Sequence, residues 1–205
     1  MAGTVIRSFA TPTARPFGLV HTGRYLFVAD DATLRIYQVD PETGTLVRSF
    51  AAPGTSPIGL TWDGARLWCA DNGDTKIYQV DPDSGRLIRS IASPSAGVRD
   101  IAFDGRALWA IDAVDLKLYQ VDPDKGRVIR SISSPGAAPS GLAFDGRALW
   151  HSDITADTIY QINPISGTVI TSFAAPSTST RALAFDGRTL WAVDFDAKKF
   201  YQINL

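Results

Sequence analysis

Five aspartates recur at a constant spacing of 41 residues, each of them at the end of a short run that predicts a strand. Carboxylates are preferred ligands of Ca²⁺, and several converging on one point repel each other unless they are protonated, hydrogen-bonded or bridged by a cation. They are Asp30, Asp71, Asp112, Asp153 and Asp194. Alternatively, each carboxylate caps its own loop by accepting backbone N–H groups two or three residues later. We favour this interpretation, which needs no metal.

Additional aspartates close to this set keep calcium in consideration. They are Asp31, Asp74, Asp115, Asp157 and Asp196. Their spacing matches no recognised calcium-binding loop. We therefore assign no metal and no cofactor, and keep the set of five as a candidate ion ring.

A second set of positions shares the 41-residue spacing, but its residues differ while their surroundings repeat. They are Phe17, Ile58, Arg99, Ser140 and Arg181. Two arginines among them could form forked hydrogen bonds with a carboxylate or phosphate, and the apolar members could provide a wall. These five are the candidate ligand-binding residues. The alternatives are sequence drift at exposed loop ends, or an Arg99 that pairs with Asp100.

Residues suited to catalysis are few and scattered. His21 and His151 occupy different positions of the repeat, which disfavours a shared metal or a paired acid–base arrangement. Cys69 lies in an apolar run with no basic neighbour to activate it, and Glu42 lies in a tight turn. We therefore predict no catalytic residue and no enzymatic activity.

Aromatic residues also recur with the repeat, as Phe27 followed by Trp68, Trp109, Trp150 and Trp191. Such a series could stack against carbohydrate, but each member lies in the middle of an apolar run. Core packing is the favoured interpretation.

These residues are positioned by an internal repeat. The segment Ile36 to Pro41 recurs in similar form four more times, and its tyrosines lie 41 residues apart. Five periods of 41 residues account for all 205 residues. A fixed period of about 40 to 45 residues is typical of propeller blades.

Each period contains four short runs rich in β-branched and aromatic residues, which predict strands. In the second copy they are Ile58 to Trp62, Arg66 to Ala70, Lys76 to Val80, and Leu87 to Ile91. The first two runs are joined by Asp63-Gly64, a strong hairpin signal. The last two are joined by a Pro-containing and Gly-containing turn like Asp40 to Gly44. The other connections vary, and alternate connections lie on one side of an up-and-down sheet, so we expect one tight-turn face and one variable-loop face.

The second and third runs are apolar on both alternating faces, as in a sheet packed between two others. The fourth run usually carries an arginine, as expected of an outer edge that resists pairing with other chains. The sequence therefore predicts an all-β, five-bladed β-propeller. We expect one domain, 1–205, with blades at about 17–50, 58–91, 99–132, 140–173 and 181–203. Residues 5–9 would complete the last blade and close the ring.

The pattern GLAFDGRALW followed by IYQVDPxxG resembles bacterial propeller repeats of the NHL, PQQ-like and streptogramin-lyase-like groups over the whole chain. The turn Asp40 to Gly44 is similar to that of PQQ-type blades. Those blades continue to a Trp, whereas here Arg48 and Ser49 follow. The resemblance implies the fold, although such proteins usually have more blades. The near-identical copies also suggest a designed, reconstructed or recently amplified sequence.

Composition excludes several classes of partner. A formal net charge of -1 argues against binding to nucleic acid or to a membrane surface. The start of the sequence shows no charged segment followed by an apolar stretch, so we expect no signal peptide.

We predict a soluble monomer that acts as a symmetric scaffold or binding module, with a small ligand or a protein bound at the axial opening of the variable-loop face. The alternatives are a lyase-like propeller enzyme and a multivalent lectin.

Overall fold

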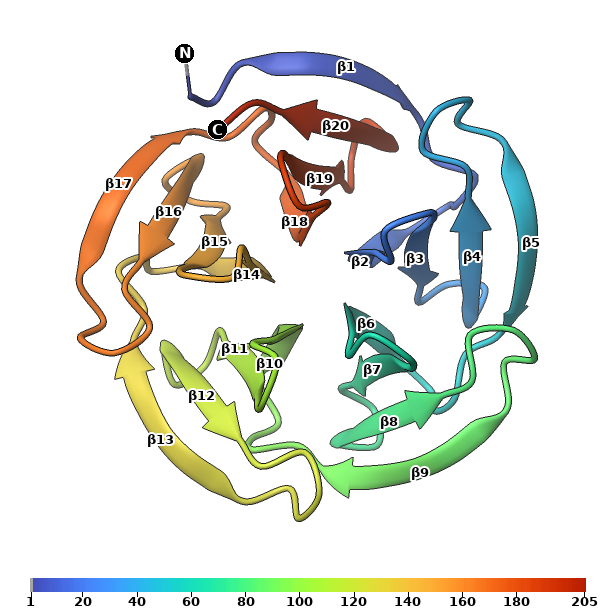
Figure 1. Cartoon of the computed structure of the whole chain (residues 1–205), viewed down its shortest axis with the longest axis horizontal. Coiled ribbons are helices and arrows are strands. Elements are labelled where there is room, and N and C mark those ends of the chain that lie inside the picture. The colour runs from blue at the N-terminus through green and yellow to red at the C-terminus, as the bar shows by residue number, and fades with distance from the viewer. Residues whose placement is uncertain (1) are drawn as a thin grey trace.

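A computed structural model describes residues 2–205 of the protein. In it the chain forms a ring of antiparallel β-sheets. The ring has five sheets of four strands each, and they radiate from a common axis (Figure 1). This is the predicted five-bladed β-propeller. Within residues 2–205, no helix has the length and apolar character needed to cross a membrane.

Every blade has an inner strand, two middle strands and an outer strand (Figure 1). The inner strands are β2 (Pro16–His21), β6 (Pro57–Trp62), β10 (Val98–Phe103), β14 (Pro139–Phe144) and β18 (Thr180–Phe185). The second strands are β3 (Leu26–Asp30), β7 (Leu67–Asp71), β11 (Leu108–Asp112), β15 (Leu149–Asp153) and β19 (Leu190–Asp194). The third strands are β4 (Arg35–Val39), β8 (Lys76–Val80), β12 (Lys117–Val121), β16 (Thr158–Ile162) and β20 (Lys199–Ile203). The outer strands are β5 (Leu46–Ala51), β9 (Leu87–Ala92), β13 (Val128–Ser133), β17 (Val169–Ala174) and β1 (Val5–Ala10).

The ring is closed by β1, which pairs with β20 and thereby completes the sheet of β18 and β19. Phe9 lies opposite Phe200 in this pairing, and a register shift occurs between Val5 and Arg7. The chain ends therefore lie side by side at the rim (Figure 1). The predicted closure by the first strand is confirmed.

Tight turns fix the register of each blade on one side of the ring. In the Asp63–Arg66 hairpin, the Asp63 N–H donates to the Arg66 carbonyl, and Gly64 adopts a φ of 97°. The Asp63 carboxylate accepts the N–H groups of Ala65 and Arg66 at 2.9 and 2.7 Å. Asp-Gly suits this turn because a residue without a side chain tolerates positive φ.

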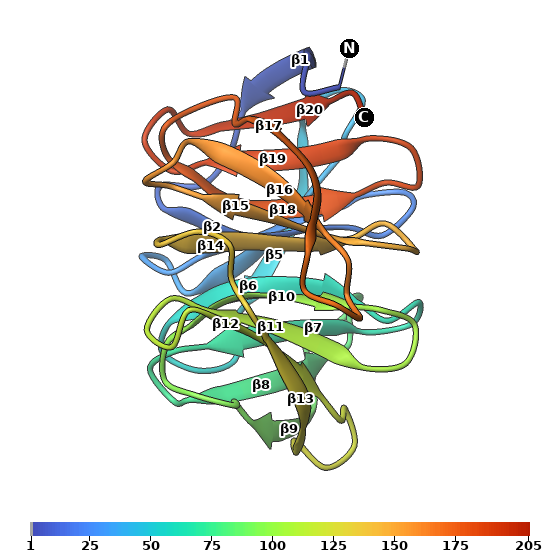
Figure 2. The same ribbon diagram turned by 90° about the vertical axis from the view of Figure 1, so that its left-hand side faces the viewer.

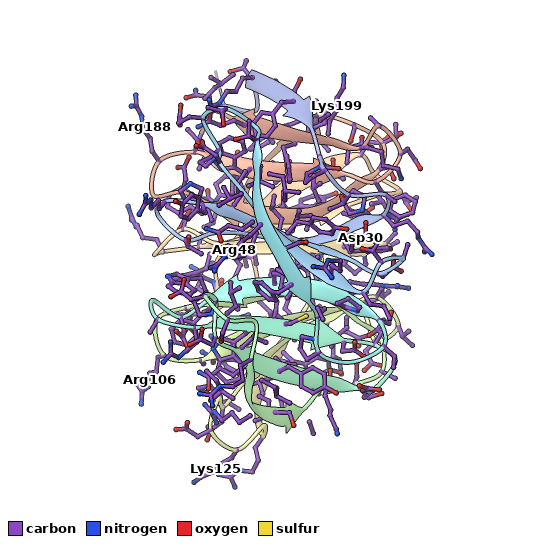
Figure 3. The ribbon with its side chains drawn as sticks, turned by 90° about the vertical axis from the view of Figure 1, so that its right-hand side faces the viewer. Asp30, Arg48, Arg106, Lys125, Arg188 and Lys199 are labelled. Atoms are coloured by element: carbon purple, nitrogen blue, oxygen red, sulfur yellow. The ribbon has the colours of Figure 1, made fainter. Side chains whose placement is uncertain are left out.

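The opposite side carries longer loops and is called here the variable-loop face. It consists of loops 11–15, 31–34, 52–56, 72–75, 93–97, 113–116, 134–138, 154–157, 175–179 and 195–198. Arg106 and Arg188, from two tight hairpins, extend from one side of the ring, whereas Asp30 lies toward the other (Figure 3). The predicted division into two faces is therefore present.

The hydrophobic core lies between neighbouring blades, in five clusters that each combine strands from two sheets. Trp68, Trp109 and Trp191 are almost completely buried within these clusters. They do not form an exposed stacking surface, so packing is their role in the fold. Figure 2 shows the ring from its edge, with outer strands β13 and β17 crossing in front of the inner strands.

A polar relay repeats from blade to blade beside this core. The Trp68 indole N–H donates to Asp63 at 2.8 Å, and the Gln79 amide donates to the same carboxylate. Gln79 then accepts the Arg89 Nε at 2.9 Å. Blade one lacks the hydrogen bond between indole and carboxylate, because Phe27 replaces the Trp and Thr22 replaces the Asp.

The outer-strand arginines do more than carry charge along an edge. Arg48, on β5 (Figure 3), donates to the Pro82 carbonyl at 2.7 Å and to the Asp83 carboxylate at 3.0 Å. Arg89 reaches Asp124 in the same way. Each arginine therefore joins its own blade to the tight turn of the next one, a role that its place on an outer strand did not suggest.

Candidate functional site

The five repeated aspartates lie at the ends of the second strands, and each binds the loops of its own blade. Asp30 accepts the N–H groups of Ala14 and Arg15 at 2.7 and 3.0 Å, and those of Ala32 and Thr33 at 2.9 and 2.8 Å. Burial acts to raise the pKa of Asp30, but these four donors hold it below its ordinary value. One carboxylate thus joins two loops of the variable-loop face.

The other members of the set form similar bonds. Asp71 accepts Ser56 N–H at 2.7 Å, and Asp153 accepts Ala138 N–H at 2.7 Å. Asp112 is bonded by the Ser95 hydroxyl and Asp194 by Ala197 N–H. Within residues 2–205 no cluster of three or more His, Cys, Asp or Glu could hold a metal ion. This geometry supports loop capping, and the ion ring stays an untested prediction.

The five candidate ligand-binding residues lie where the inner strands begin, around the axis on the variable-loop face. Arg99, Ser140 and Arg181 line one pocket of about 180 Å³, together with Ala113, Ala137, Ala138, Pro139 and Ile154. Phe17 and Ile58 complete the circle, and Phe17 packs against the cluster that contains Ile58. The Ser140 hydroxyl donates to the Arg181 carbonyl at 2.9 Å, which joins two blades beside the pocket.

Arg181 is the member of this circle with an unmet hydrogen-bonding capacity. Its Nε is buried and has no hydrogen-bond partner among residues 2–205. Burial lowers the pKa of Arg181, and the charge of Arg99 lowers it further, while Asp196 and Asp194 act to raise it. A buried guanidinium donor beside a second arginine lacks an acceptor that a carboxylate or phosphate oxygen would supply.

Two aromatic rings support the cations at this opening. Phe17 and Phe195 lie 5.2 Å apart, and the Arg181 guanidinium lies 5.2 Å from the Phe195 centroid. Arg15 lies 5.7 Å from the same centroid, and the Lys198 ammonium lies 4.2 Å from it. Arg15 also pairs with Asp31 at 3.2 Å. Cation–π contacts orient positive side chains without neutralising them. Of the two cations that join Arg181 at Phe195, Arg15 is therefore paired with a carboxylate, whereas Lys198 is in no ion pair found among residues 2–205.

Lys198 also belongs to a repeated set of residues with an unusual backbone conformation. Five loops of the variable-loop face end in a non-glycine residue with positive φ: Leu34, Thr75, Leu116, Asp157 and Lys198, with φ between 48° and 54°. The left-handed region costs an L-residue about 1–2 kcal/mol. Such strain persists where surrounding contacts fix the backbone, and it clusters at functional loops.

Asp100 lies directly after Arg99 but does not pair with it. Its carboxylate accepts the backbone N–H groups of Ile101 and Leu142, both at 2.9 Å, and of Leu60 at 3.3 Å. Burial raises the pKa of Asp100 well above its ordinary value, although these bonds act to lower it. The alternative in which Arg99 is neutralised by Asp100 is therefore wrong, because the carboxylate is directed to the axis and is saturated by backbone donors.

The two histidines lie apart in the structure. His21 ends inner strand β2 and lines the axial cavity on the tight-turn side. His151 is buried in β15, stacked on Tyr160 with its ring centroid 5.4 Å away. Cys69 is also buried, and burial raises the pKa of its thiol, so it is not activated as a nucleophile. Glu42 is exposed and pairs with Arg7 at 3.0 Å in a tight turn.

Sequence reasoning found the two arginines of the pocket but missed Arg15, Phe195 and Lys198, which lie in variable loops and approach the axis only in three dimensions. It also missed Asp100. A signal for Asp100 existed, because the equivalent positions hold Gly18, Gly59, Gly141 and Ala182. A carboxylate in a series of glycine and alanine marks a site where one blade differs chemically from the rest.

No protein-family model and no curated protein matches the sequence. Solved structures share the fold. A crystal structure of glutaminyl cyclase from Myxococcus xanthus matches with a TM-score of 0.85 at 15% identity, covering 98% of this chain and 95% of the other. Catalytically inactive virginiamycin B lyase from Staphylococcus aureus, crystallised with quinupristin, matches with a TM-score of 0.61 at 18% identity, covering 96% and 83%. Selenomethionine-substituted virginiamycin B lyase from the same organism matches with a TM-score of 0.58 at 20% identity, covering 96% and 68%.

These comparisons correct one expectation. The scattered histidines led to the prediction that the protein is not an enzyme, and that prediction is contradicted by the enzymes that share its fold over almost the whole chain. The reason is that sequence motifs reveal catalytic groups only when they lie close together in the chain, whereas a propeller brings residues from different blades to one axis. At these identities the likeness establishes the propeller fold, in agreement with the resemblance to streptogramin-lyase-like repeats.

Proposed function

We propose that the protein binds a small organic anion, carrying a carboxylate or phosphate group, at the axial opening of the variable-loop face. The observation that carries the proposal is the buried, unpartnered Nε of Arg181 beside Arg99. Arginine offers a planar set of donors that matches the two oxygens of a carboxylate or phosphate. The proposal concerns recognition of the anion, and it holds whether that anion is a ligand or a substrate.

The pocket supports a ligand of limited size. Its volume of about 180 Å³ is below the usual range for drug-sized ligands, and its walls include Ala113, Pro139 and Ile154. A molecule with one anionic group and a short apolar part would fill it. Lys198, held against Phe195, adds positive charge near the opening and would attract the anion before it is bound.

Titration calorimetry with inorganic phosphate, acetate, succinate and citrate tests the proposal. We expect at least one of these probes to bind the wild-type protein with 1:1 stoichiometry. Arg181→Gln should weaken that binding by about tenfold or more, because a hydrogen bond to a charged group contributes roughly 1.5–3 kcal/mol. Arg99→Gln should act in the same direction.

Arg188→Gln is the matched control, since Arg188 is exposed on the tight-turn side and the change removes the same charge. It should leave the affinity unchanged. The proposal is wrong if none of the four probes binds, or if Arg181→Gln and Arg188→Gln have equal effects.

A further inference from the structure

The inner strands meet at one level of the axis, where little room exists for side chains. This level contains Gly18, Gly59, Asp100, Gly141 and Ala182. A Cβ added to Gly59 would lie 2.8 Å from the Asp100 Cα, and one added to Gly18 would lie 2.7 Å from the Gly59 carbonyl carbon. Real Cβ atoms do not approach other atoms so closely. The strands are thus in backbone contact, and the Asp100 side chain occupies the space that remains.

Backbone donors point into this space because the inner strands are sheet edges. In the blade of β6 and β7, the Asp63 N–H donates to the Arg66 carbonyl, and two residues earlier Thr61 lies opposite Trp68. In an antiparallel pair only every second residue exchanges hydrogen bonds with the neighbouring strand. The N–H groups of the residues between them on β6 therefore point away from β7. Leu60 is one of these residues, and its N–H is directed to the axis. Free N–H groups of an edge strand need acceptors from outside their own sheet.

Asp100 supplies acceptors to several blades at once. One carboxylate oxygen accepts Leu60 N–H of β6 and Ile101 N–H of its own strand, and the other accepts Leu142 N–H of β14. Asp100 is completely buried. None of the ion pairs within residues 2–205 includes it.

We infer that the propeller axis contains a binding site for one small anion, formed by backbone N–H groups of three blades, and that Asp100 is its internal ligand. Burial raises the pKa of Asp100, but all three backbone groups at the carboxylate are donors and so favour a group that only accepts hydrogen bonds. The class of ligand that fits them is a monovalent anion the size of a carboxylate or halide ion. Convergent backbone N–H groups are a known form of anion site. This site is separate from the arginine pocket, and neither inference depends on the other.

The occupied site also divides the axis. The arginine pocket of about 180 Å³ lies on the variable-loop side of Asp100. On the other side, a cavity of about 90 Å³ is lined by the next residues of the inner strands, including Leu19, Leu60 and Leu142. Asp100 and the closely packed backbones at its level therefore lie between the two cavities.

Chemical rescue of Asp100→Gly at pH 7.5 tests this inference. The variant places glycine where blades one, two and four already have it, so the backbone can accept the change. It should melt below the wild type, and about 100 mM sodium formate should raise its Tm by about 4 °C more than it raises that of the wild type. Sodium bromide should act in the same way, and a crystal soaked in bromide should show anomalous density beside the amide nitrogens of Leu60 and Leu142.

Asp100→Asn is the matched control. It retains the side-chain volume and one acceptor oxygen, so it leaves no space for formate and should gain no more from the salt than the wild type. If Asp100→Gly does not fold in chloride-free buffer, refolding it with formate should restore the native circular dichroism spectrum. The inference is overturned if formate and bromide stabilise Asp100→Gly no more than the wild type, or if refolding with formate yields no native protein.

Discussion

At the scale of single residues, the repeat shows which positions a blade can change. His151 occupies the position held by Val28, Cys69, Ala110 and Ala192 in the other blades. Its ring is buried, with Nδ1 2.9 Å from the Ser152 carbonyl and Nε2 3.3 Å from the Ser134 hydroxyl. Burial lowers the pKa of His151 to about 4, against an ordinary value of 6.5. The fold thus accommodates the neutral imidazole and excludes the charged one.

This pKa predicts a pH-dependent loss of stability. Below pH 6.5 the unfolded chain binds a proton at His151 that the folded chain does not bind until the pH approaches 4, so acid favours unfolding in that window. Between pH 7.5 and 4 the wild type should lose roughly 3 kcal/mol more unfolding free energy than His151→Val. Urea denaturation at several pH values measures the difference. Equal pH slopes for the two proteins would contradict the prediction.

At the scale of elements, the relay from hairpin to outer strand connects successive blades. Arg89 bonds Gln79 and Asp124, and its guanidinium lies 5.0 Å from the Trp68 ring centroid. Arg66 offers a comparison, because it forms an ion pair with Asp81 at 3.3 Å and is likewise partly exposed.

Arg89→Ala should lower the unfolding free energy by about 1–2 kcal/mol, since a charged hydrogen bond and a cation–π contact are lost. Arg66→Ala should cost no more than about 0.5 kcal/mol, as is usual for an exposed ion pair. Urea denaturation of both variants gives the comparison. Equal losses for the two variants would show that the relay stabilises the fold no more than an ordinary exposed ion pair does.

The elements themselves were largely predictable from sequence, for a physical reason. Strand and turn signals depend on neighbouring residues, so Lys76–Val80 was predicted with its observed bounds and Leu87 to Ile91 ended one residue early. The candidate site was only partly predictable. Arg99 and Arg181 were found because they break a repeat, whereas Phe195 contributes through contacts across blades. Asp100 also breaks the repeat, but the backbone groups that it bonds in neighbouring blades are far away in sequence, so the sequence alone does not reveal those bonds.

At the scale of the whole molecule, the closure of the ring rests on one strand from the beginning of the chain. β1 contributes Phe9, whose ring centroid lies 5.9 Å from that of Trp191 and 5.3 Å from that of Phe200. Gly3 N–H donates to the Asn204 carbonyl, and Asn204 N–H donates to the Thr4 carbonyl. In the other blades one continuous turn, such as Asp40 to Thr45, makes this connection. Here it is made by hydrogen bonds between the two ends of the chain.

Deletion of residues 1–9 should therefore weaken the last blade most. It removes Phe9 from the core between the fifth and first blades and leaves the outer edge of β20 without a partner strand, while β19 still pairs with its inner edge. We expect the unfolding free energy to fall by roughly 3 kcal/mol or more, as for other losses of a packed Phe, and the exposed edge to promote dimers or aggregates. Light scattering after size-exclusion chromatography, together with urea denaturation, measures both effects.

A circular permutant that begins in loop 11–15 and joins Leu205 directly to Met1 is the control, because this junction continues the 41-residue period without a gap. The permutant should remain a stable monomer, and a deletion variant that matched it in both measurements would show that β1 does not hold the ring closed.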